Sequence, residues 1–197
     1  MSSKVDNLIE KFKIALTSTA KVISDDLELN KFSEKQSKKN DIIDINDLTK
    51  PSDFIRLRAE TDSAALKKKF SNNDIYKKNL PSNSSSKSLY NIAEKIRYES
   101  LGCLMLKGIE KNLKDNYSQF IDLKRKDQLK NKEDVPIVEA FELYMLKKFL
   151  NIELNSLSKN ILHFWEKDFD QAIEKHMKFL KENMEYQNQY SSKFSEI

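Results

Sequence analysis

The chain has 197 residues, of which 39% are hydrophobic and 34% are charged, and its formal net charge is +4. Eleven Phe and seven Tyr can supply one sizeable core, so the composition excludes an intrinsically disordered chain. Only two Gly and three Pro are present, which argues against all-β folds because these need frequent turns. The single cysteine excludes an intramolecular disulfide and a multi-cysteine zinc module. A mainly α, multi-helix fold in a single domain spanning residues 1–197 is therefore expected.

Residues 3–25 are predicted to form an amphipathic helix. Apolar side chains recur there at the three- and four-residue spacing of one helix face, namely at Val5, Leu8, Ile9, Phe12, Ala15, Leu16, Val22 and Ile23. The next stretch differs, because Leu27 and Leu29 flank a polar residue and residues 42–45 form a short β-branched run. These two stretches favour a short β-hairpin near residues 27–45.

A second helix is predicted to begin at Pro51, because the fixed φ of proline suits a first helical turn. Its inner face is expected to carry Phe54, Leu57, Thr61, Ala64, Ala65 and Phe70. Residues 71–88 are rich in Asn and Ser and contain Pro81. This composition is typical of a polar loop.

The helical period returns at Leu89 and continues to Leu113, which predicts one helix over residues 89–113. Both glycines of the chain, Gly102 and Gly108, lie inside this segment. A glycine inside a helix costs about 1 kcal/mol relative to alanine, so each glycine needs a reason. We expect both to mark a bend or close packing, the latter against the final helix or the first one.

Three further helices are predicted towards the C-terminus. Residues 116–130 have a weaker helical pattern, and Pro136 can open the next helix. The last helix is expected to be the longest, because apolar positions from Leu157 to Tyr190 follow one face and no Gly or Pro interrupts them before Ile197.

The sequence offers no catalytic, cofactor-binding or metal-binding residues. Both glycine-rich phosphate-binding motifs are absent, so this chain alone is not expected to hydrolyse ATP. His163 and His176 are too far apart in sequence to form a metal-binding pair, and a partly buried helix histidine is favoured over a ligand at His163, although Glu166 follows three residues later. Cys103 lies among leucines and is expected to act as a small core residue.

The basic residues leave several interpretations open. Lys67, Lys68 and Lys69 fall at a predicted helix end, where cations suit the helix dipole, although an acidic partner or a nucleic acid is an alternative ligand. Arginine is scarce, and its planar fork binds carboxylates as lysine cannot. Three arginines are therefore the candidate partner-binding residues: Arg56, Arg58 and Arg97. Arg58 is expected to pair with Asp62 and Arg97 with Glu94, one turn away in each case, whereas Arg56 is expected to be freer.

The central part of the chain resembles the N-terminal region of the CobT subunits of aerobic cobaltochelatase. The first helix of that family carries Arg and Asp-Ser-x-Ala-Leu, and its second carries Arg-x-Glu-Ser-(Ile/Leu)-Gly followed by Gly-(x)3-Asn-Leu. These motifs match Arg56, Asp62, Ser63, Ala65, Leu66, Arg97, Glu99, Ser100, Leu101, Gly102, Gly108, Asn112 and Leu113. The last helix also looks like that of the family, so the resemblance covers most of the chain and is weak before residue 50.

The resemblance implies a non-catalytic adaptor of a three-component machine that inserts cobalt(II) into a corrin ring during cobalamin synthesis. The implied partners are an AAA+ ATPase subunit and a large catalytic subunit, and the complex uses ATP, Mg and Co(II). The acidic linker and the C-terminal von Willebrand-A-type domain of the family are absent from this sequence. The alternative function is a helical nucleic-acid-associated or general protein-interaction domain. The 31 acidic residues argue against the nucleic-acid role.

A cytoplasmic location is expected. The N-terminal residues include Asp6 and Glu10 and lack the continuous apolar core of a signal peptide. No apolar run approaches the roughly 20 residues that a membrane-spanning helix needs.

Overall fold

The computed structural model describes residues 2–28, 48, 50–122 and 131–197. The α-helices are α1 (Ser2–Ser24), α2 (Pro51–Phe70), α3 (Asn73–Asn79), α4 (Ser84–Met105), α5 (Lys107–Asp122), α6 (Ile137–Phe149), α7 (Ser156–His163), α8 (Glu166–Glu182) and α9 (Gln187–Ser195), and Lys132–Asp134 forms a 3-10 turn. No strand occurs in the described ranges, so the mainly α fold is confirmed. The hairpin near residues 27–45 lies outside the described residues, except that residues 27–28 form a turn.

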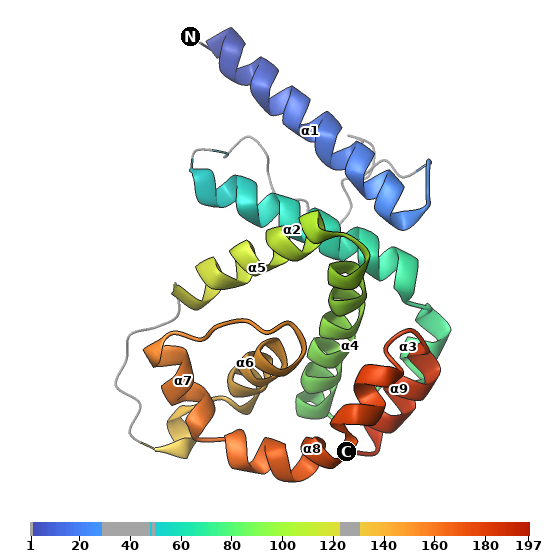
Figure 1. Ribbon diagram of the computed structural model, residues 1–197, viewed down its shortest axis with the longest axis vertical. Coiled ribbons are helices and arrows are strands. Elements are labelled where there is room, and N and C mark those ends of the chain that lie inside the picture. The colour runs from blue at the N-terminus through green and yellow to red at the C-terminus, as the bar shows by residue number, and fades with distance from the viewer. Residues whose placement is uncertain (1, 29–47, 49, 123–130) are drawn as a thin grey trace.

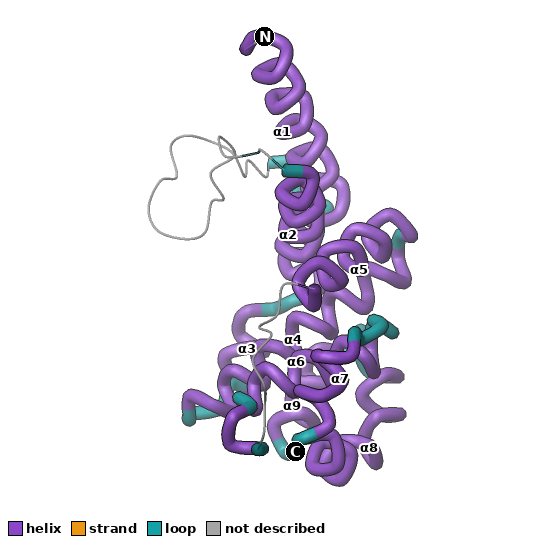
Figure 2. The backbone as a smooth tube through the Cα atoms, turned by 90° about the vertical axis from the view of Figure 1, so that its left-hand side faces the viewer, coloured by secondary structure: helices purple, strands orange, loops and turns teal. Residues whose placement is uncertain are grey.

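Helix α4 runs through the middle of the molecule and contacts α2, α5, α6 and α9 (Figure 1). Helix α1 packs along α2 at one end, and α6 to α9 gather at the other (Figure 2). The rings of Phe12 and Phe54 are 4.9 Å apart near the start of α2, and Asp26 pairs with Lys68 near its end. The two helices therefore run in the same direction. No helix in the described part of the chain is long and apolar enough to cross a membrane.

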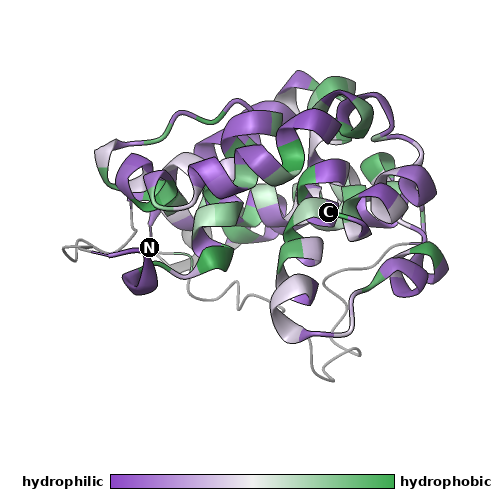
Figure 3. Cartoon of the chain, turned by 90° about the horizontal axis from the view of Figure 1, so that it is seen from below, coloured by the Kyte–Doolittle hydropathy of each residue, from purple (hydrophilic) through white to green (hydrophobic). Residues whose placement is uncertain are grey.

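The core is deepest at α6, where Leu143, Tyr144, Met145 and Leu146 are all fully buried. Helix α6 is covered by α4, α7 and α8, so it is apolar around most of its circumference. The outer helices alternate between hydrophilic and hydrophobic residues along their length, as Figure 3 shows. This pattern is typical of helices with one buried face.

The prediction of a polar loop over residues 71–88 is wrong. The side chain of Asn72 accepts hydrogen bonds from the amides of Asp74 (2.8 Å) and Ile75 (3.1 Å), and thereby caps α3. Asn83 accepts from the amide of Ser86 (2.7 Å) and caps α4. Asn is favoured at helix N-caps as well as in loops, so the same composition starts two helices here.

The prediction of one helix over residues 89–113 is also wrong, because α4 ends at Met105 and α5 begins at Lys107. Leu106 between them has an extended backbone, and its amide donates to the carbonyl of Gly102 (3.0 Å). The two glycines therefore lie in different helices. Helix α5 covers the first part of the helix predicted over residues 116–130, and residues 123–130 lie outside the described ones.

The single long helix predicted at the C-terminus is divided into α7, α8 and α9. Between α7 and α8, the indole of Trp165 donates to the carbonyl of Val135 (3.0 Å). Between α8 and α9, the guanidinium of Arg97 donates to the carbonyl of Met184 (2.9 Å). Both breaks are stabilised by hydrogen bonds to residues distant in sequence, which explains why no Gly or Pro marks them. The helix predicted to open at Pro136 is confirmed, with Pro136 as the N-cap of α6.

Candidate functional site

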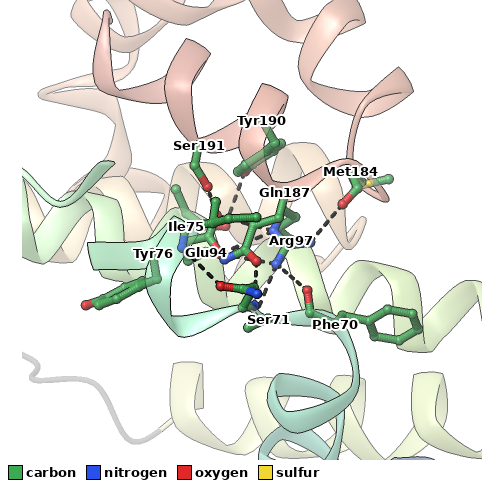
Figure 4. Close-up of polar contacts among 12 residues, drawn as sticks. Phe70, Ser71, Ile75, Tyr76, Glu94, Arg97, Met184, Gln187, Tyr190 and Ser191 are labelled. Carbon is green, nitrogen blue, oxygen red and sulfur yellow. Dashed lines mark hydrogen bonds and ion pairs between the residues drawn. The ribbon is translucent and has the colours of Figure 1, made fainter. Parts of the chain in front are cut away.

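A network of buried hydrogen bonds surrounds Glu94 and Arg97 on α4 (Figure 4). The side chain of Arg97 is fully buried and Glu94 is 3% exposed. Nε of Arg97 donates to both carboxylate oxygens of Glu94 at 3.3 Å, and Nη2 donates to Oε2 at 3.2 Å. The ion pair predicted from the spacing of these residues is therefore confirmed.

The remaining donors of Arg97 bind the ends of two other helices. Nη2 donates to the carbonyl of Phe70 (2.8 Å), the last residue of α2, and to Oγ of Ser71 (3.3 Å). Nη1 donates to the carbonyl of Met184, just after α8. Carbonyls at helix C-terminal ends lack intrahelical donors and carry partial negative charge, so a cation is well placed there.

Glu94 in turn connects α4 to α9. It accepts from Nε2 of Gln187 (3.1 Å) and Oγ of Ser191 (2.6 Å). The hydroxyl of Tyr190 donates to the carbonyl of Ala93 (3.2 Å), and Oε1 of Gln187 accepts from the amide of Asn72 (2.6 Å). We call Glu94, Arg97, Gln187 and Ser191 the Glu94 cluster. It joins the ends of α2 and α8 to α4 and α9.

The interpretation of Arg97 as a partner-binding residue is wrong, because its side chain has no exposed surface. Arg56 and Arg58 are on the surface of α2, where the Arg56 guanidinium lies 3.5 Å from the carboxylate of Glu60 and that of Arg58 lies 5.5 Å from the ring centroid of Phe12. Asp62, the expected partner of Arg58, is 2% exposed and accepts from Nδ2 of Asn112 (2.8 Å). A role of Arg56 and Arg58 in partner binding stays a prediction.

A second buried carboxylate, Glu99, lies further along α4 and is 1% exposed. It accepts from Oγ of Ser63 on α2 (2.5 Å) and from the hydroxyl of Tyr117 on α5 (2.5 Å). Burial raises the pKa of Glu99, and the nearby charge of Lys95 opposes this shift. We call Glu99, Ser63 and Tyr117 the Glu99 cluster.

Several residues of the family motifs meet at this crossing of α2, α4 and α5. Ser63 with Glu99 and Asp62 with Asn112 form hydrogen-bonded pairs between helices. The motifs thus identified the residues but not their pairing. Tyr117 was missed, and its only sequence signal is its place on the apolar face of α5.

The two glycines have opposite surroundings. A Cβ atom on Gly102 would collide with the buried side chain of Leu66 on α2, whose Cγ atom would be 3.0 Å away. A Cβ atom on Gly108 would meet no atom within 4 Å. Close packing is therefore confirmed for Gly102, although its neighbour is α2 rather than the first or the final helix, and it is wrong for Gly108.

The residues considered for metal binding or nucleophilic chemistry are His163, Glu166 and Cys103. His163 is exposed rather than partly buried, and it borders a cleft of about 830 Å³ between the end of α6 and α7. In this cleft Glu166 accepts from Nζ of Lys147 (2.7 Å). Burial raises the pKa of the Cys103 thiol to about 12, and the side chain packs against the core as expected. No group of three or more His, Cys, Asp or Glu residues is placed to hold a metal ion within the described ranges.

The lysines at the end of α2 are ion-paired in part. Lys68 pairs with Asp26 and Lys69 with Asp25, both just after α1. These contacts join α1 to α2 and reduce the positive charge available to a nucleic acid or an acidic partner.

Comparison with known proteins identifies the family. The family model described as "Cobalamin biosynthesis protein CobT" matches residues 6–197, which is nearly the whole chain. No curated protein and no solved structure gives a significant match. The match includes the helices that carry the Glu94 and Glu99 clusters. The chain therefore belongs to the CobT family of cobalamin biosynthesis proteins.

Proposed function

We propose that this chain is a non-catalytic adaptor of an ATP-dependent cobaltochelatase, which inserts cobalt(II) into a corrin ring. The observation that carries the proposal is the CobT family match over residues 6–197. In the proposed complex an AAA+ ATPase subunit binds ATP and Mg, and a large subunit holds the corrin ring and the cobalt. This chain connects the two through its surface.

The buried polar groups support a scaffolding role. Glu94 and Glu99 are the kind of residues that bind metals or transfer protons, yet both are at most 3% exposed and accept hydrogen bonds from other helices. Arg97 donates hydrogen bonds to Glu94 and to backbone carbonyls at the ends of two helices. These contacts stabilise the relative positions of α2, α4, α5 and α9, and a rigid surface is what an adaptor has to present.

Reconstitution of the chelatase from its purified subunits tests this function. The chain is expected to bind the ATPase subunit in a pull-down and to be required for cobalt insertion in the presence of ATP. Calorimetry with the isolated chain is expected to give no ATP binding in the micromolar range. Full chelatase activity without the chain would contradict the proposal, and salt-dependent binding to duplex DNA with no subunit binding would favour the nucleic-acid alternative.

A further inference from the structure

Three consecutive apolar residues are exposed at the junction of α4 and α5. Figure 1 shows where the two helices meet. Leu104 is 77% exposed, Met105 38% and Leu106 48%. Isolated exposed leucines are common, but a run of three on the surface marks an interaction site more often than chance. The flanking residues Leu101 and Ile109 are buried, so the run is held between two anchored helix ends.

Gly108 adds an independent observation at the same place. It lies in the first turn of α5, it has no positive φ, and a Cβ atom on it would meet open space. Neither backbone conformation nor packing within the described chain therefore requires glycine there, although glycine weakens a helix. Because glycine has no side chain, another chain can approach its backbone more closely than it could approach that of any other residue.

The charges around this surface define the partner further. Lys107 is exposed, and Lys111 is 78% exposed with its Nζ 4.0 Å from the carboxylate of Asp115. The acidic residue between them, Glu110, is bound by Lys114 at 2.7 Å. The three lysines and two carboxylates beside the apolar run sum to a net charge of +1, which suits acidic residues on the partner.

We propose that Leu104, Met105, Leu106 and Gly108, which we call the α4–α5 corner, dock an amphipathic helix with acidic flanks from the ATPase subunit. The inference rests on the proposed function and adds the docking surface to it. The apolar side chains contact the apolar face of the incoming helix, and Gly108 lets its backbone come close. The corner is held in place by the buried residues Leu101 and Ile109 on either side of it.

Two variants of the full chain test the corner, with affinity for the ATPase subunit measured by calorimetry. Gly108→Leu fills the open space, and Leu104→Ser removes the most exposed apolar side chain. Each is expected to weaken binding by about tenfold or more. The thermal midpoint of Gly108→Leu is expected to equal or exceed that of the wild type, because no atom of the chain lies in its way. Val22→Ser on α1, where Val22 is 69% exposed, is the matched control and is expected to bind normally.

The outcomes separate this inference from the proposed function. If both corner variants bind the ATPase subunit as tightly as the wild type does, the corner is not the docking surface. The proposed adaptor function would be unaffected by that result. If the corner variants instead lose binding to the large subunit, or lose self-association in sedimentation, the ATPase subunit is not the occupant of the corner. A wild-type chain that binds neither subunit would overturn both proposals.

Discussion

The two buried carboxylates of α4 are stabilised in different ways. Glu94 is paired with a buried cation, Arg97, and also accepts from Gln187 and Ser191. Glu99 accepts from the hydroxyls of Ser63 and Tyr117, and its pKa is raised by burial. Removing Arg97 would leave the Glu94 carboxylate buried without its charge partner. At the second site, the hydrogen bonds from the two hydroxyls lower the pKa of Glu99 less than burial raises it, so this residue should make stability depend on pH.

The two clusters also connect different parts of the chain. The Glu94 cluster joins α9 and the end of α8 to α4 and the end of α2, and these segments are far apart in sequence. The Glu99 cluster joins α2, α4 and α5, and the motif pair Asp62–Asn112 lies at the same crossing. Loss of the first should release the C-terminal helices, and loss of the second should loosen the α2–α4–α5 crossing.

The largest effect is expected from Arg97→Met. The change leaves Glu94 as a buried charge without its cation and leaves the carbonyls of Phe70 and Met184 without these donors. Removing one partner of a buried ion pair costs about 3–5 kcal/mol of unfolding free energy, measured by urea denaturation. Arg58→Met, at an exposed arginine, is the matched control and is expected to cost less than about 1 kcal/mol. Equal losses in the two variants would contradict the structural role of Arg97.

A smaller loss is expected from Gly102→Ala, between the Glu99 cluster and the α4–α5 corner. The added methyl group would push against Leu66, which is fully buried and has little room to move. Overpacking of this kind costs about 1–3 kcal/mol, and thermal unfolding would measure it. An unchanged thermal midpoint would show that α2 and α4 can separate without cost.

The pH dependence of stability tests the Glu99 side of the comparison. A raised pKa in the folded state means that the native protein keeps this proton to higher pH than the unfolded chain does. The contribution of Glu99 to the free energy of unfolding is therefore greatest below the ordinary carboxyl pKa of 4.5 and declines as pH rises towards the raised value. Glu99→Gln removes this decline, so urea denaturation over a pH series should give wild-type and variant curves that diverge. Parallel curves would mean that Glu99 titrates normally.

The smallest effect is expected from Gly108→Ala, and its sign is opposite to that of Gly102→Ala. Because a Cβ atom on Gly108 meets nothing, only the gain in helix propensity remains. Stability should rise by about 0.5–1 kcal/mol, visible as a higher thermal midpoint. A loss of stability would place Gly108 in a contact that this structure does not contain.

The local spacing of residues in the sequence was sufficient to predict several features of this protein. The helix starting at Pro51, the helix opened by Pro136 and the Glu94–Arg97 pair all depend on residues within one or two turns of each other. Family membership could also be inferred, because the motif residues keep their spacing along the chain. Interactions over such short distances are read directly from the sequence.

Other features, which the periodicity of the sequence could not predict, depend on the tertiary structure. Arg97 has the sequence neighbours of a surface arginine, but the ends of α2 and α8 cover it, so it binds inside the protein rather than to a partner. Gly102 and Gly108 look alike in sequence, and only the position of Leu66 distinguishes them. The breaks before α8 and α9 depend on hydrogen bonds from Trp165 and Arg97 to residues elsewhere in the chain. Such contacts join segments far apart in sequence, so they exist only once the helices have packed together.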